Sequence, residues 1–277
     1  MIPASFEYER AESIDHAVEL LGSSDDAKII AGGHSLLPLM KLRLARPEML
    51  VDISRIGDLG YIRDDGDAIA IGALARHHDL ANSDVLQSGC EIVSYAAGQI
   101  GDPQVRHVGT IGGSVAHSDP ASDMPTVLLA LDATMVVRGA AGAIREVGAA
   151  DFFKGLFEPD LASDEVLAEI RVPKTAGRGW SYIKFHRRAQ DWALVGVAAV
   201  AGSNGDGTAI ALTNMGERPL RAGAVERALA GGADPAGASE HAAVGTSPPS
   251  DPFGSAEYRR ELSKVLVRRA LEETMSG

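Results

Sequence analysis

The sequence predicts a layered α+β fold in two domains, a larger α/β-layered one over residues 1–176 and a smaller sheet-plus-helix domain over residues 177–277. Two patterns support this prediction. In the first part, short apolar runs alternate with segments of helical period, which is typical of packed α/β layers. In the second part, strand-like runs follow one another directly and one long amphipathic helix comes last. A chain of 277 residues is long enough for two hydrophobic cores.

The first elements are a helix and three strands. Ser13 has the character of a helix N-cap, apolar residues recur at helical spacing over 14–21, and Gly22 predicts the end of that helix. We expect the larger domain to divide into two subdomains near residues 55–60. Three short apolar runs bounded by turn residues are predicted as strands: 28–31, 49–53 and 68–73.

The rest of the larger domain continues the alternation. Residues 84–100 mix apolar and small side chains at roughly helical spacing. Asp123 and Pro125 open a further predicted helix, because proline is tolerated in a first turn. Apolar runs over residues 135–138 and 166–172 predict two more strands.

The smaller domain is predicted as three strands and a final helix. The strands cover residues 180–186, 194–202 and 208–213, with a turn over residues 204–207 between the last two. Residues 231–254 are rich in glycine, alanine, proline and serine and are predicted to be mostly loop. The final helix is expected to pack through a stripe made of Tyr258, Leu262, Val265, Leu266 and Ala270.

Composition excludes several classes of partner and cofactor. Lysine and arginine number 26 against 38 aspartates and glutamates, a formal charge of −12, which has the wrong sign for binding nucleic acid. Cys90 is the only cysteine, so the chain forms no intrachain disulfide and cannot by itself ligate an iron–sulfur cluster. We expect a cytoplasmic protein without signal peptide, transmembrane segment or metal site.

Two glycine doublets in similar settings are the most informative local feature. Two segments contain them, Ala31-Gly32-Gly33-His34-Ser35 and Thr110-Ile111-Gly112-Gly113-Ser114. Both come near apolar runs, end in a hydroxyl residue and are predicted to be loops that precede a helix or a tight turn. Adjacent glycines admit positive φ angles and let backbone N–H groups approach a ligand closely. Because Gly-x-Gly-x-x-Gly and P-loop patterns are missing from the sequence, we expect these amides to bind the diphosphate of a buried cofactor rather than a transferable phosphate.

The segments around these doublets resemble a known family. Residues 31–43, 101–125 and 184–193 look like those of the FAD-binding medium subunits of the molybdenum hydroxylases, and aerobic carbon monoxide dehydrogenase is the nearest type. The resemblance covers nearly the whole chain. It implies a vanillyl-alcohol-oxidase-type FAD-binding domain followed by a small C-terminal domain of the carbon monoxide dehydrogenase flavoprotein type.

The resemblance also implies which residues contact the cofactor. Trp192 stands where many relatives carry a tyrosine beside the isoalloxazine ring, and Ser114 stands where asparagine is common. Ile100 would lie near the adenine end, and Leu167 would act partly through its backbone. The full set of implied contacts is Ala31, Gly32, Gly33, His34, Ser35, Leu36, Ile100, Thr110, Ile111, Gly112, Gly113, Ser114, Asp123, Leu167, Lys184 and Trp192.

The family's electron-transfer scheme implies partners and a relay role. FAD is bound non-covalently and takes electrons from two [2Fe–2S] clusters on a small subunit, while a large subunit holds the molybdenum cofactor. The expected assembly is a dimer of such heterotrimers, acting on an external acceptor such as a quinone and able to lie at the inner face of the membrane. No side chain of this chain is expected to act as a catalytic acid or base.

Alternative interpretations stay open at this stage. The glycine doublets could be ordinary turns in an assembly or scaffold protein, or the chain could be a self-contained flavin oxidoreductase. His34 could order its own loop, and Arg187 and Arg188 could form a solvated face. Four further histidines lack metal-ligand spacing and are predicted to be structural or surface residues: His77, His78, His107 and His117.

Overall fold

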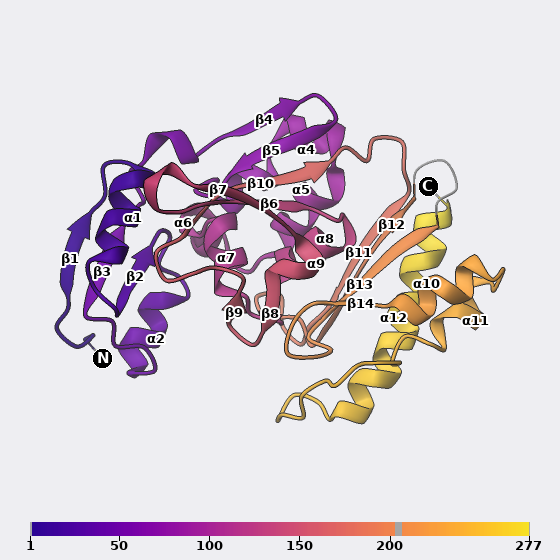
Figure 1. Cartoon of the computed structure of the whole chain (residues 1–277). Coiled ribbons are helices and arrows are strands. Elements are labelled where there is room, and N and C mark those ends of the chain that lie inside the picture. Colours follow the sequence, from indigo (N-terminus) through magenta and orange to yellow (C-terminus); the bar gives the residue numbers. More distant parts are fainter. Residues whose placement is uncertain (1, 203–206, 277) are drawn as a thin grey trace.

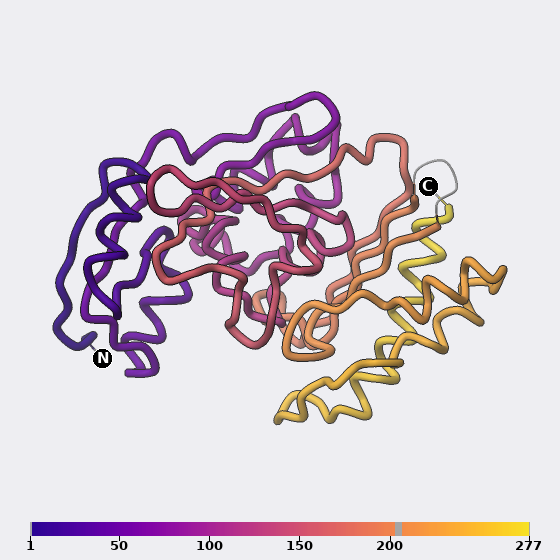
Figure 2. Tube along the Cα trace, viewed as in Figure 1, coloured from indigo at the N-terminus to yellow at the C-terminus, as the bar shows by residue number. Residues whose placement is uncertain are grey.

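The computed structural model describes residues 2–202 and 207–276. It has three layered units arranged in chain order, from a small sheet at the indigo end to a sheet backed by a long yellow helix at the other (Figure 1). The smooth colour gradient along the trace shows that each unit is formed mainly by consecutive segments (Figure 2). Residues 204–206 of the predicted turn lie outside the described residues.

The first unit is a three-stranded parallel sheet in the order β1-β3-β2, with strands Glu7–Arg10, Met49–Asp52 and Ala27–Ile30. Helix α1 (Ile14–Gly22) is capped by Ser13, whose side chain accepts from the His16 amide, and it buries its apolar face against this sheet. Strand β2 leads through residues 31–35 into α2 (Leu36–Leu42). The strand therefore delivers the first glycine doublet to one edge of the unit.

The second unit is an antiparallel five-stranded sheet with helices packed on one face. Its order is β4-β5-β10-β6-β7, over Ile62–Asp65, Ala68–Gly72, Val166–Pro173, Thr134–Arg138 and Ile144–Gly148. Strand β10 lies in the middle and is mostly buried, although Glu169 and Arg171 interrupt its apolar run. The helices are α3 (His77–Ala81), α4 (Asp84–Gly89), α5 (Glu91–Gln99), α6 (Pro103–Val108), α7 (Ile111–His117) and α8 (Asp123–Ala130).

Short elements connect these layers. Two 3₁₀ turns cover Gly57–Leu59 and Ala140–Gly142, and a two-stranded ribbon pairs β8 (Phe153–Gly155) with β9 (Glu158–Pro159) after the single-turn helix α9 (Ala149–Phe152). The second glycine doublet, which the sequence suggested as a loop before a helix or tight turn, lies inside the first turn of α7. Packing thus overrides the poor helix propensity of glycine there.

The third unit is an antiparallel four-stranded sheet, β11 (Trp180–Phe185), β12 (Val195–Ala201), β13 (Thr208–Thr213) and β14 (Leu220–Arg221). Side chains of β12 alternate between two cores because the strand period is two. Ala198 and Val200 join the core that contains α8, while Val197 and Ala199 face the long helix α12 (Ala256–Ser276). The sheet is therefore buried on both faces.

The helices of the third unit differ in part from the prediction. Residues 231–254 are mostly irregular, but α10 (Gly223–Ala230) precedes them and α11 (Pro235–Ser239) lies within them. The buried face of α12 runs through Arg259, Ser263, Leu266, Val267, Ala270, Leu271 and Thr274. Tyr258 and Val265 are each 47% exposed, so the predicted stripe was wrong at these two positions. Both lie off the line of the buried residues, which recur at three- and four-residue steps.

The sheet boundaries bear on the predicted domains. One sheet ends with β10 at Pro173 and the next begins with β11 at Trp180, while the first unit ends at Asp52 and β4 begins at Ile62. We keep the division at residues 176 and 177, and the split near 55–60, as a proposal. Within the described part of the chain, no helix combines the length and apolar character needed to cross a bilayer.

Candidate functional site

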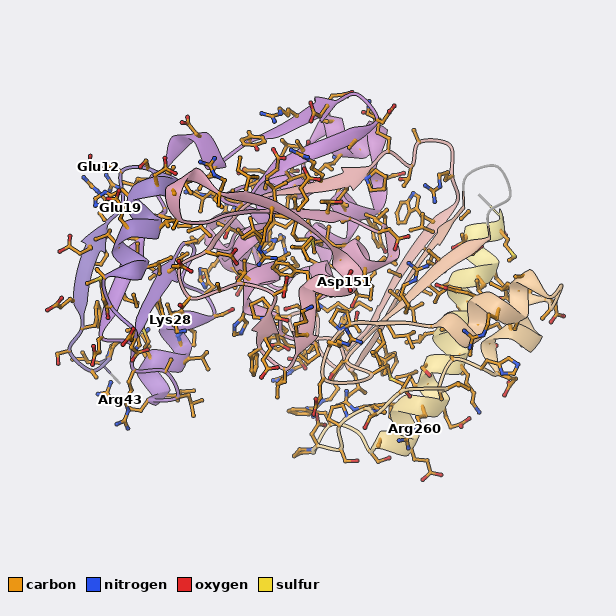
Figure 3. All side chains as sticks on the ribbon, viewed as in Figure 1. Glu12, Glu19, Lys28, Arg43, Asp151 and Arg260 are labelled. Carbon is orange, nitrogen blue, oxygen red and sulfur yellow. The ribbon has the colours of Figure 1, made fainter. Side chains whose placement is uncertain are left out.

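A cavity of about 690 Å³ lies between the three units, within the size range of small-molecule and cofactor sites. Its walls come from β2 and the segment after it, from His77 of α3, from the stretch 100–117 that contains α6 and α7, from residues 159–165, and from the loop between β11 and β12. Lys28, labelled on β2 in Figure 3, belongs to this wall. Distant parts of the sequence therefore meet around one space.

Thirteen of the implied contact residues line this cavity, and three do not. Those that line it are Ala31, Gly32, Gly33, His34, Ser35, Leu36, Ile100, Thr110, Gly113, Ser114, Asp123, Lys184 and Trp192. Ile111 is fully buried, Gly112 packs against Ala73, and Leu167 is a core residue of β10 that is only 4% exposed. These three residues belong to the packed interior next to the cavity wall and do not line the cavity.

The first glycine doublet presents a row of free amides. Gly33 has a φ of +69°, and the backbone N–H groups of residues 32–36 have no hydrogen-bond acceptor among the described residues. The Gly33 carbonyl accepts from the Leu37 amide at 2.9 Å, which fixes the turn into α2. Consecutive unpaired amides beside a cavity form a favourable place for a phosphate group.

The second doublet has a different local role, because its amides already have partners. Gly113 N–H donates to Thr110 Oγ1 at 3.1 Å, Ile111 N–H to the Ala75 carbonyl at 3.0 Å and Gly112 N–H to the Ala73 carbonyl at 2.9 Å. A Cβ on Gly112 would lie 2.5 Å from the Ala73 Cβ. Of the second doublet, Gly113 thus provides a side-chain-free surface at the cavity rather than a free donor, and Gly112 packs against the core.

The two glycine-bearing segments touch each other directly. A Cβ on Gly32 would lie 2.4 Å from the Val108 carbonyl oxygen and 2.8 Å from the Gly109 Cα. No residue larger than glycine fits at position 32 without separating the segments. The absence of a side chain at Gly32 therefore lets the first glycine segment pack against the backbone just before the second one.

A buried ion pair lies on another side of the cavity. Lys184 Nζ is 2.9 Å from Asp123 Oδ2 and also donates to the Gln99 carbonyl at 3.2 Å, and both charged side chains are almost fully buried. The Tyr182 hydroxyl donates to Asp123 Oδ1 at 2.5 Å. Burial raises the pKa of Asp123, while the Lys184 ammonium and the Tyr182 hydroxyl oppose that rise. The pair fastens β11 to the first turn of α8.

Trp192 lies at the outer rim of the cavity. Its side chain belongs to the β11–β12 loop and is 58% exposed, and it also lines a second hollow of about 500 Å³ near Phe253 and Arg259. Arg187 extends over the Phe253 ring at 4.7 Å, so this arginine is not simply solvated. An exposed aromatic side chain at such a rim can stack on a flat ring system.

Sequence reasoning missed several wall residues. His77 and His117, predicted to be structural or surface residues, both line the cavity. So do residues 159–165, where Glu165 is held by Arg145 at 2.7 Å and accepts from the Ala162 amide at 2.8 Å. No local sequence pattern around these two histidines or in residues 159–165 predicts that they line a cavity. Among the residues that the structure describes, no group of three or more histidine, cysteine, aspartate or glutamate side chains forms a metal site.

The cavity fits FAD on three independent observations. Its volume suits a cofactor, its first glycine segment offers unpaired amides for a diphosphate, and its rim carries an exposed aromatic residue for a ring. A positive side chain, Lys184, also belongs to the wall. The residues present therefore suit an anionic dinucleotide with an aromatic end.

Two family models match nearly the whole chain. The first is described as the FAD binding domain in molybdopterin dehydrogenase and matches residues 4–175. The second is described as the CO dehydrogenase flavoprotein C-terminal domain and matches residues 180–274.

Two relatives that are named as medium chains align over nearly their full length. The chain is 40% identical over 280 residues to the glyceraldehyde dehydrogenase medium chain of Sulfolobus acidocaldarius, covering 99% of both chains. It is 42% identical over 280 residues to the carbon monoxide dehydrogenase medium chain of Hydrogenophaga pseudoflava, covering 98% of this chain and 97% of that one. A solved structure of the latter organism's carbon monoxide dehydrogenase, lacking the Mo-pyranopterin moiety, matches with a TM-score of 0.95 at 43% identity, covering 100% and 99% of the two chains. On these grounds the chain belongs to the FAD-binding medium subunits of the molybdenum hydroxylases.

Proposed function

We propose that this chain holds non-covalent FAD in its central cavity and relays electrons from the [2Fe–2S] clusters of a small partner subunit to an external acceptor. The observation that carries the proposal is the row of unpaired amides at residues 32–36 beside a cavity of about 690 Å³. Membership of the FAD-binding family supports it. FAD, when bound, supplies the redox chemistry, and the protein supplies position and electrostatics.

Each part of the wall has a proposed task. The amides of residues 32–36 donate to the diphosphate, and Gly113 allows close approach from the facing segment. Lys184, held by Asp123, adds positive charge, and Trp192 covers the ring end. Ile100 packs near the adenine end. We propose no catalytic acid or base within this chain.

The partners follow from the same proposal. We infer a heterotrimer with a small iron–sulfur subunit and a large molybdenum subunit, assembled as a dimer of heterotrimers in the cytoplasm. The relatives are named as medium chains, which supports a multi-subunit enzyme. We propose that the molybdenum subunit selects the substrate. Among the types of complex we favour carbon monoxide dehydrogenase, and we propose a quinone as one class of electron acceptor. The two relatives are named for different substrates, glyceraldehyde and carbon monoxide.

An absorption spectrum of the purified chain, before and after acid precipitation, tests the cofactor assignment. We expect flavin bands that move into the supernatant on precipitation. Yellow colour kept in the precipitate would mean covalent attachment and contradict the proposal. A colourless chain that binds no added FAD, alone or with co-purified partner subunits, would contradict the proposal and support the alternative in which the glycine doublets are ordinary turns of a scaffold protein.

A further inference from the structure

His77 occupies a buried position at the junction of the cavity walls. It is the first residue of α3 and is 4% exposed, and its side chain lines the cavity. Its backbone N–H donates to the Gly109 carbonyl at 3.1 Å, which ties α3 to the segment that leads into the second glycine doublet. The neighbouring residue, Arg76, forms a β-bridge with Thr110. The backbone of His77 is therefore fixed against the segment that leads into the second doublet.

The imidazole ring lies where the two glycine-bearing segments meet. A Cβ on Gly109 would lie 3.2 Å from the His77 Cδ2 and 3.6 Å from its Nε2. Gly32, from the other segment, stands against the same backbone at Val108 and Gly109. The Nε2 edge of the ring is thus beside the backbone that brings the two doublets together.

The hydrogen bonding of the ring is incomplete. Nδ1 is fully buried and has no partner among the described residues. Burial lowers the pKa of His77 to about 4, with Arg106 and His34 contributing, so the ring is neutral at neutral pH and carries one proton. A buried N–H without an acceptor costs more than an unpaired lone pair, which favours the proton on Nε2. The donor then stands on the edge beside Gly109 and needs an acceptor.

We propose that His77 donates a hydrogen bond from Nε2–H to a diphosphate oxygen of bound FAD, and is therefore a cofactor-binding residue. This inference rests on the proposed function, because it assumes FAD in this cavity. It adds a side-chain donor to the amides of residues 32–36, which lie in the facing segment. It also gives the Nε2–H donor of a neutral buried imidazole an acceptor, while Nδ1 stays an unprotonated buried nitrogen.

The test is FAD titration of the full chain carrying His77→Leu, with His78→Leu as the matched control. His78 is the next residue of the same helix, stacks on His107 at 3.9 Å between ring centroids and does not belong to the cavity wall. We expect His77→Leu to weaken FAD binding about tenfold, equivalent to about 1.4 kcal/mol, and the control to bind like wild type. Competition by ADP, which carries a diphosphate without flavin, should show the same fold loss. His77→Gln, which keeps an N–H donor, should recover part of the affinity.

Thermal unfolding without FAD gives a second, independent readout. A leucine at position 77 removes a buried polar group that lacks a partner, so the cofactor-free variant should unfold at an equal or higher temperature than wild type. A purely structural histidine predicts the reverse, and a lowered midpoint together with unchanged FAD affinity would overturn the inference. Equal FAD affinity in His77→Leu and wild type would overturn it while leaving the proposed function intact. A wild-type chain that binds no FAD even with its partner subunits would remove both.

Discussion

Replacing Gly33 by valine is the sharpest single test of how the first glycine segment holds its ligand. At a φ of +69° the backbone of residue 33 is in the left-handed region, which costs an L-residue about 1–2 kcal/mol and a β-branched residue more. A Cβ there would also lie 3.0 Å from Leu37 Cδ1 and 3.3 Å from Ile30 Cδ1, so Leu37 must move. Relief of this strain turns the amides of residues 32–36 away from the cavity.

The magnitude follows from the cost of restoring that conformation on binding. A strain of about 2 kcal/mol corresponds to about a 30-fold loss of FAD affinity, measured by fluorescence titration of the cofactor-free chain. Gly66→Val is the matched control, because Gly66 has a φ of +79° in the β4–β5 turn and nothing within 4 Å of its Cβ position. The control should lose stability and keep its affinity. If Gly33→Val binds FAD as tightly as Gly66→Val does, the proposed role of the first segment is refuted.

Three further predictions concern the rim, the ion pair and pH. The Trp192→Ala variant should still bind FAD, and its free energy of unfolding should change by less than about 0.5 kcal/mol because the side chain is exposed. The rate at which the reduced protein reduces oxygen should change. Loss of FAD from this variant would contradict the proposal that Trp192 only covers the ring. Lys184→Met leaves Asp123 as an unpaired buried carboxylate and should cost about 3–5 kcal/mol in urea unfolding, with much of it regained when Asp123→Asn is added. His77 has a folded-state pKa of about 4, below its ordinary value, so its contribution to stability is complete above about pH 6.5 and is lost as the pH falls toward 4. At pH 5 wild type should therefore lose about 2 kcal/mol more than His77→Leu relative to pH 7, and parallel pH profiles would show that His77 does not titrate this way.

The three inner strands of the central sheet, β5, β10 and β6, were predictable because buried apolar residues dominate them, whereas the edge strands β4 and β7 were not predicted. Strand β10 keeps this signature although it contains Glu169 and Arg171, and both β5 and β6 pair with it in the structure. Strand β1 was not predicted, since Glu7 to Arg10 form an exposed edge without apolar alternation, which pairs with β3 through the backbone and through the hydrogen bond that Tyr8 donates to Asp52. The sequence therefore predicts buried strands well, and it predicts exposed edge strands poorly.

The candidate site was predictable only where glycine carried the signal. Gly32, Gly33 and Gly113 line the cavity, and Gly33 has the left-handed backbone that only glycine adopts readily. The division of labour between the doublets was not visible, because it depends on whether Ala73 and Ala75 offer acceptors to α7. His77 was assigned a structural role since its cavity neighbours are brought together by tertiary folding. Such contacts leave no local spacing for a sequence pattern to report.

The ion pair between Lys184 and Asp123 has a consequence for the order of events during synthesis. Asp123 leaves the ribosome well before Lys184, and the β11–β12 segment that completes the cavity rim follows later still. Until then the acid at the start of α8 has no cation beside it and the cavity lacks one wall. We therefore expect cofactor loading to follow the docking of the third unit. A nascent chain that ends before β11 would carry both glycine doublets without the cavity residues that come from the third unit.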